Sequence, residues 1–198
     1  LTETELDFVR VQAETLHRDT DKALVGGFYT GSLGGPGSLT FADWMIALVT
    51  EKQWVKEVQA ARVEATIENL ALYREAVGDR VEAIVVSGYD YGTQKAELFA
   101  PEIFRELFVP HVRTINEWIH QNTSWKTIYH TDGSIRQIMG DMIDAGVDVL
   151  NPVQLSAADM NANELKSTFG DRVVFWGAGP DPQETLPFGT PEQVRAEV

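Results

Sequence analysis

A histidine and two aspartates lie where loops follow predicted strands. His130 ends the apolar run 125–130, and Asp132 comes two residues later. Asp90 follows another apolar run, residues 81–87. A histidine and a carboxylate at positions i and i+2 of a loop can converge on one metal ion or on one substrate proton, and a loop aspartate can act as a general acid or base. We therefore predict that all three residues are catalytic and that His130 and Asp132 bind a metal.

Both aspartates also have a structural explanation. An Asx turn would account for Asp90, and Asp132 could cap a helix that starts near Ser134. With no cysteine in the chain, a third metal ligand would be Asp90 or another oxygen, or a residue outside these 198.

Five more side chains in the same loops could contact a substrate. They are Tyr89, Tyr91, Asn151, Gln154 and Trp176. The two amides flank a proline and could fix polar substrate groups, although a plain turn explains them equally well. The tryptophan ends its strand, where an aromatic ring either walls a planar ligand or fills the core.

The elements that would position these residues alternate along the chain. Five short, nearly continuous apolar runs are typical of strands buried on both faces of a parallel sheet. They cover residues 22–27, 81–87, 125–130, 147–151 and 172–177. Helical patterns cover residues 4–17, 41–51, 53–77, 102–121, 134–145 and 161–169, with another beginning at 191. Pro110 is expected to kink the fourth of these helices.

Strands that alternate with helices predict an α/β fold, either an open doubly wound sheet or part of a (β/α)8 barrel. A complete barrel needs about 250 residues, so about three strands would lie outside this chain. In both architectures ligands bind beyond the carboxyl ends of the strands. The corresponding loops are residues 28–38, 88–94, 130–134, 151–154 and 178–183.

The composition indicates the class of protein. A formal net charge of −14 argues against nucleic-acid binding, which relies on clustered Lys and Arg. No apolar run is long enough to span a membrane, and no N-terminal signal is present. We expect a single domain over residues 1–198 that is located in the cytoplasm and binds a small molecule. The sequence leaves open whether the protein forms a homo-oligomer.

The loops and the segments around them resemble the uroporphyrinogen decarboxylase superfamily. The matching stretches are residues 88–94 with 100–104 (APEIF), 130–135 (HTDGSI), 144–154 (DAGVDVLNPVQ) and 175–198. The superfamily includes the decarboxylase of tetrapyrrole synthesis and the zinc-dependent methyltransferases that exchange methyl groups with corrinoid proteins. The resemblance implies a (β/α)8 barrel, truncated in this chain at both ends.

The two branches of this superfamily differ at the predicted metal site. The methyltransferases carry a His-x-Cys pair as zinc ligands; here His130 matches the histidine and Asp132 takes the place of the cysteine. The decarboxylase is metal-free and generally lacks this histidine. The resemblance therefore implies metal-dependent methyl transfer, with zinc and a corrinoid carried by a partner protein. Uroporphyrinogen III decarboxylation, a step of porphyrin biosynthesis, and non-catalytic binding of a small metabolite are the alternatives.

Overall fold

In the computed structural model, which describes residues 1–27, 35–177 and 179–198, five parallel strands form one sheet. The strands lie in the order β1-β2-β3-β4-β5, as they follow one another in the chain. They are β1 (Val25–Gly27), β2 (Ala83–Gly88), β3 (Lys126–His130), β4 (Val149–Asn151) and β5 (Val174–Phe175). A sequential order without reversal is that of a barrel wall and excludes the doubly wound alternative.

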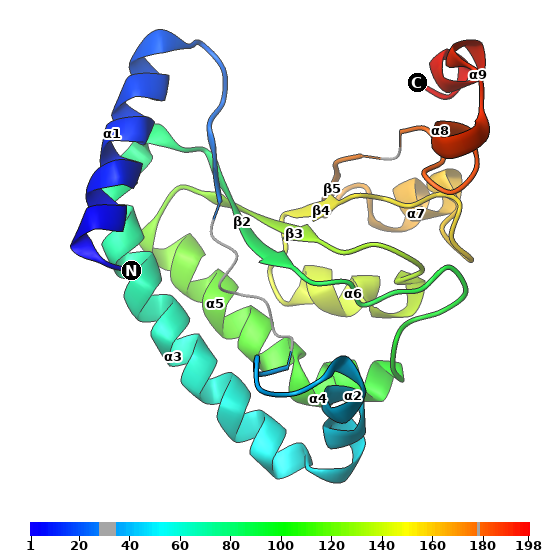
Figure 1. Ribbon diagram of the computed structural model, residues 1–198, viewed down its shortest axis with the longest axis horizontal. Coiled ribbons are helices and arrows are strands. Elements are labelled where there is room, and N and C mark those ends of the chain that lie inside the picture. The colour runs from blue at the N-terminus through cyan, green and yellow to red at the C-terminus, as the bar shows by residue number, and fades with distance from the viewer. Residues whose placement is uncertain (28–34, 178) are drawn as a thin grey trace.

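Helices connect successive strands and cover the sheet (Figure 1). Their bounds are α1 (Glu3–Asp19), α2 (Phe41–Thr50), α3 (Lys52–Val77), the 3-10 turn η2 (Gly78–Arg80), α4 (Pro101–Leu107), α5 (Val109–Asn122), α6 (Arg136–Asp144), α7 (Ala162–Phe169), α8 (Thr185–Phe188) and α9 (Pro191–Glu197). In Figure 1, α3, α5 and α6 lie on one side of the sheet, and α1 packs along α3. None of the described helices combines the length and the apolarity that a membrane crossing needs.

Most predicted elements form within a few residues of their expected bounds. The central strand β3 has three consecutive buried residues, as a strand covered on both faces requires. Three strands are clearly shorter than predicted: β1 and β4 have three residues each and β5 has two. The predicted loop 28–38 lies largely outside the described residues, and so does the first residue of loop 178–183.

The helix predicted over residues 102–121 is two helices. α4 ends at Leu107 and α5 begins at Val109, with Pro110 in the first turn of α5. Proline has no N–H to bond the carbonyl four residues earlier, and its ring clashes with that carbonyl. At a helix start neither cost applies, so the chain begins a new helix where a kink was predicted.

The other helix ends follow local sequence signals. Thr2 and Glu5 form a capping box at α1, and Thr190 and Gln193 form another at α9. The Asn161 side chain accepts hydrogen bonds at the start of α7. α6 starts at Arg136 without a side-chain cap, so the reading of Asp132 as a helix cap is wrong.

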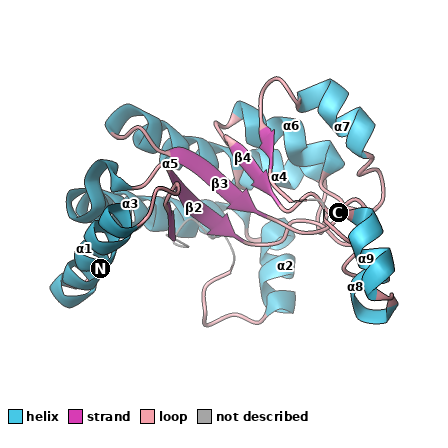
Figure 2. Cartoon of the chain, turned by 90° about the horizontal axis from the view of Figure 1, so that it is seen from above, coloured by secondary structure: helices cyan, strands magenta, loops and turns pink. Residues whose placement is uncertain are grey.

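The register of the sheet aligns three strand ends. Gly88 of β2, His130 of β3 and Asn151 of β4 are direct neighbours across the sheet. The helices α8 and α9 lie on the side toward which the strand arrows point (Figure 2). The loops that carry the predicted site residues therefore meet at one edge of the sheet.

A carboxylate ties the opposite ends of the strands to α5. The Asp148 carboxylate accepts hydrogen bonds from Thr127 N at 2.9 Å and lies 2.7 Å from His120 Nε2. Lys126 Nζ is 3.5 Å away. Partial burial by itself would raise the pKa of Asp148, but the bonds from Thr127 and the adjacent His120 and Lys126 together lower it below its ordinary value.

Removal of this carboxylate should destabilise the fold in a pH-dependent way. Asp148→Ala is expected to cost about 1–3 kcal/mol in the free energy of unfolding at pH 7, because the Thr127 amide loses its acceptor. The folded pKa of Asp148 is lowered, so its contribution is full above the unfolded value of about 3.9 and is lost as the pH falls through the folded pKa. Denaturant unfolding at pH 7 and pH 3 measures both effects. The exposed Asp171, replaced by Ala, is the control, and an equal loss in the two variants would contradict the prediction.

Candidate functional site

The loops after β2 and β3 bring the three predicted catalytic residues together. His130 Nε2 lies 3.8 Å from Asp90 Oδ1 and 3.6 Å from Asp132 Oδ2. One potential ligand atom from each of the three residues lies within 4.8 Å of the other two. Their side chains are one-third to one-half exposed, so a substrate or an ion can reach all three.

Backbone contacts between the two loops hold the aspartates in place. The Asp132 backbone N–H donates to Asp90 Oδ1 at 2.9 Å, and Ser134 N–H donates to the carbonyl of Thr93 at 2.7 Å. Between these bonds Gly92 faces Gly133 so closely that neither position has room for a Cβ atom. The bond from Asp132 N–H replaces the Asx turn as the explanation of Asp90, because the Asp90 carboxylate accepts a hydrogen bond from the loop after β3.

Asn151, at the end of β4, fixes the tautomer of His130. Its Nδ2 group donates to the carbonyl of Trp176 at 2.9 Å, so its Oδ1 is the atom that faces His130 Nδ1 at 3.0 Å. An amide oxygen only accepts, hence His130 Nδ1 carries the proton. In the neutral ring Nε2 then presents its lone pair toward the two carboxylates. We predicted Asn151 as a substrate-binding residue, but both ends of its amide are already bonded within the protein.

These residues fit a divalent metal. A catalytic zinc takes three protein ligands, commonly His and carboxylates, and keeps a fourth position open. Zinc bonds of about 2.0–2.2 Å would separate tetrahedral ligands by roughly 3.3–3.6 Å, close to the two distances from His130 Nε2. A histidine that binds a metal usually donates its other ring N–H to an acceptor that fixes its tautomer, as His130 does to Asn151. Asp90 is therefore the third ligand candidate within the described residues.

The Asn151 contact should show in metal affinity. Asn151→Ala removes the acceptor for His130 Nδ1 and is expected to weaken zinc binding by about 10–100-fold, as other losses of such support do. Asn151→Asp keeps an acceptor at the same place and should retain most of the affinity. Competition titrations against a zinc chelator measure both. Equal affinities for Ala and wild type would contradict the supporting role of Asn151 in metal binding.

Two adjoining hollows open beside these residues. The larger, of about 500 Å³, lies between the loops after β4 and β5 and ends at Glu197 of α9. The smaller, of about 390 Å³, lies between the loops after β2 and β3 and includes Asp90. Asp132, Gln154 and Pro182 line both. Gln154 thus lies where it was predicted to meet a substrate, and its Oε1 accepts from Gly133 N–H at 2.9 Å.

The predicted role of Tyr91 is wrong. Its side chain is fully buried: its ring contacts the rings of Phe104 in α4 and of Phe108, the residue between α4 and α5, with centroids 5.2 and 5.8 Å away. Burial raises the pKa of the Tyr91 phenol. Tyr91 anchors the loop through its backbone N–H, which donates to Thr131 Oγ1 at 2.9 Å. No signal in the sequence separates it from Tyr89, since helices later in the chain supply the enclosing rings.

The other two aromatic candidates are accessible. Tyr89 is half-buried beside the site, and burial, with the neighbouring Asp90 charge, raises the pKa of its phenol. The phenol therefore stays protonated at neutral pH and can donate a hydrogen bond. Trp176 is 49% exposed, so the core alternative is wrong, but neither Trp176 nor Tyr89 lines either hollow.

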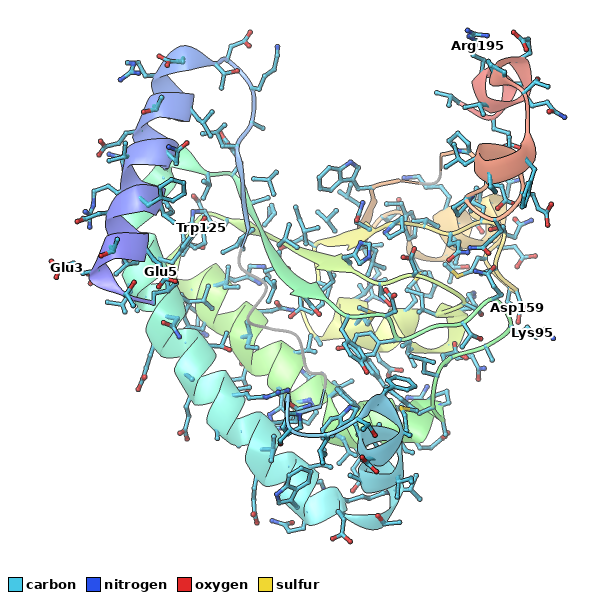
Figure 3. The ribbon with its side chains drawn as sticks, viewed as in Figure 1. Glu3, Glu5, Lys95, Trp125, Asp159 and Arg195 are labelled. Carbon is cyan, nitrogen blue, oxygen red and sulfur yellow. The ribbon has the colours of Figure 1, made fainter. Side chains whose placement is uncertain are left out.

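The two cations near the loops in sequence do not face the site. Arg136 lies over the ring of Phe169, 4.9 Å from its centroid. Lys95 is exposed and extends outward from the loop after β2 (Figure 3). Within the described residues no lysine or arginine lines either hollow. The site is thus acidic.

The parallel strands lie in sequential order, and polar residues gather at their carboxyl ends. These two features define the class of protein as a partial (β/α)8 barrel, in which the site lies at the carboxyl ends of the strands. Comparison with known families then identifies the family. The model of the family described as uroporphyrinogen decarboxylase (URO-D) matches residues 2–198, and the chain belongs to this family.

A solved structure supports the same fold. A methyltransferase from Methanosarcina mazei superimposes with a TM-score of 0.70 over 97% of this chain, at 20% sequence identity. The chain spans 52% of that methyltransferase's length. A search of curated proteins found no significant match. The predicted partial URO-D-like barrel is thus confirmed.

Proposed function

We propose that this chain supplies the metal-binding part of a URO-D family enzyme that transfers a methyl group to or from a corrinoid protein. The observation that carries the proposal is the environment of His130. Its Nδ1 is held as a donor by Asn151, which leaves Nε2 between the carboxylates of Asp90 and Asp132. The fold shared with the methanosarcinal methyltransferase is consistent with it.

The metal, its three ligands and Tyr89 would each have a separate role in the reaction. A zinc ion at this place would act as a Lewis acid and lower the pKa of the group that takes or gives the methyl. His130, Asp90 and Asp132 would hold it and leave one position for that group. The hydrogen bond from Asp132 N–H keeps Asp90 in place, and the protonated Tyr89 phenol could donate to a substrate atom.

The lining supports methyl transfer better than uroporphyrinogen III decarboxylation. A substrate with several carboxylates needs cationic partners, whereas the described lining of both hollows carries Asp90, Asp132, Asp181 and Glu197 without a lysine or arginine. The remaining alternative, binding without catalysis, predicts no turnover. An activity assay therefore decides between them.

The test uses methylcobalamin in place of the corrinoid protein and 2-mercaptoethanol as the methyl acceptor. We expect zinc-dependent loss of the methylcobalamin absorbance, catalysed by the wild-type protein. A chelator should abolish it, and zinc should restore it. A rate unaffected by the chelator would contradict metal-dependent transfer, and no catalysed loss at all would contradict methyl transfer itself.

A further inference from the structure

The amide of Gln154 is an unused hydrogen-bond donor beside the site. The side chain is 6% exposed and lines both hollows. Its Oε1 accepts from Gly133 N–H at 2.9 Å, so the amide orientation is fixed and Nε2 is the other end. Within the described residues Nε2 has no hydrogen-bond partner. A buried donor without a partner costs about 1–3 kcal/mol, which a ligand with an acceptor would remove.

The surroundings of this donor select against a negative charge. Asp132 adjoins Gln154 in both hollows, and Asp181 and Glu197 line the larger one. Glu197 accepts bonds from Asp181 N–H and Thr185 Oγ1, which fixes its carboxylate at the rim. An anion placed here would meet these carboxylates with no cation among the described lining residues.

Apart from Ser156, the remaining side chains that line the larger hollow are apolar. Pro152, Val153 and Leu155 form the wall on the β4 side, and Pro180 and Pro182 form the wall on the β5 side. Such a lining favours an apolar group of modest size, and its volume of about 500 Å³ is within the range of small-molecule sites.

From these observations we infer that Gln154 is a specificity-determining residue. It selects a small, uncharged ligand that combines an apolar group with an oxygen acceptor, and it donates to that oxygen through Nε2. The inference rests on the proposed function only in identifying this ligand as the molecule that exchanges the methyl group.

Three probes of nearly equal size test the inference by ligand-observed NMR titration, with a chelator present so that metal plays no part. Acetophenone has a neutral carbonyl acceptor, benzoate carries a negative charge, and ethylbenzene has neither. We expect acetophenone to bind about five- to tenfold more tightly than ethylbenzene, the effect of one hydrogen bond. Benzoate should bind at least about tenfold more weakly than acetophenone.

Gln154→Glu is the decisive variant because it keeps the shape and the acceptor for Gly133 N–H but replaces the Nε2 donor with an oxygen. It should reduce acetophenone affinity to that of ethylbenzene and leave ethylbenzene unchanged. If the variant does not fold, Gln154→Met removes the donor without an added charge, although it also removes the acceptor for Gly133 N–H. An unchanged preference for acetophenone in a folded variant would overturn the inference, as would wild-type protein that prefers benzoate or does not prefer acetophenone to ethylbenzene. Because no metal or turnover is involved, failure here is distinguishable from failure of the methyl-transfer proposal.

Discussion

His130→Ala is expected to lower zinc affinity by roughly 10²- to 10³-fold and to abolish zinc-dependent methyl exchange. A structural zinc site releases about 10–16 kcal/mol over four ligands, so one ligand accounts for a few kcal/mol. His130 would be the only nitrogen ligand among the three residues that converge here, and its Nε2 lies 3.8 Å from Asp90 Oδ1 and 3.6 Å from Asp132 Oδ2. Wild-type protein should bind about one zinc per chain.

The measurement pairs zinc analysis with the methylcobalamin assay on the same preparations. His17→Ala is the matched control: His17 lies exposed in the last turn of α1, and its loss should change neither zinc affinity nor exchange. If His130→Ala retains zinc, the metal lies elsewhere. If it loses zinc and keeps methyl exchange, the metal has no part in the reaction, and the methyl-transfer mechanism proposed above is wrong.

The sequence predicts the fold well because its signals are local. Apolar runs bounded by Gly and polar residues locate all five strands, and the first and last helices, predicted to begin at residues 4 and 191, begin at Glu3 and Pro191. Parallel strands end at one edge, so the loop residues Asp90, His130 and Asp132 could be expected to converge. The break before Pro110 was underestimated, because whether a proline kinks a helix or starts a new one depends on how the two halves pack.

What the sequence does not reveal depends on contacts between distant residues. Asn151 was expected to meet a substrate, yet its amide joins His130 and the Trp176 carbonyl, which are 21 and 25 residues away. Tyr91 is enclosed by the rings of Phe104 in α4 and of Phe108 between α4 and α5. In both cases the residue type was informative about polarity or size, and only the packing decides which neighbour it meets.

The same packing makes the glycine pair between the loops a determinant of the site. Gly92 and Gly133 allow the two backbones to touch, and the bond from Asp132 N–H to Asp90 Oδ1 lies beside this contact. The Asp90 carboxylate is therefore held by the backbone of the loop that carries Asp132. We expect a side chain at either glycine to affect stability and zinc affinity together.

Gly133→Ala should accordingly destabilise the protein by about 2–6 kcal/mol. Its φ of +85° is unfavourable for alanine, at about 1–3 kcal/mol, and the added Cβ would come within 2.4 Å of Gly92 C and 2.7 Å of Thr93 N, an overpacking cost of about 1–3 kcal/mol. Gly140→Ala is the control, because Gly140 lies within α6 and its nearest contact would be Phe169 at 3.7 Å. Alanine there should stabilise by about 0.5–1 kcal/mol.

Denaturant unfolding of both variants gives these values, and zinc titration of folded Gly133→Ala should show weaker binding. A Gly133→Ala variant as stable as wild type, with unchanged zinc affinity, would show that the loops can separate without loss, and that the close backbone contact does not set the spacing of Asp90 and Asp132.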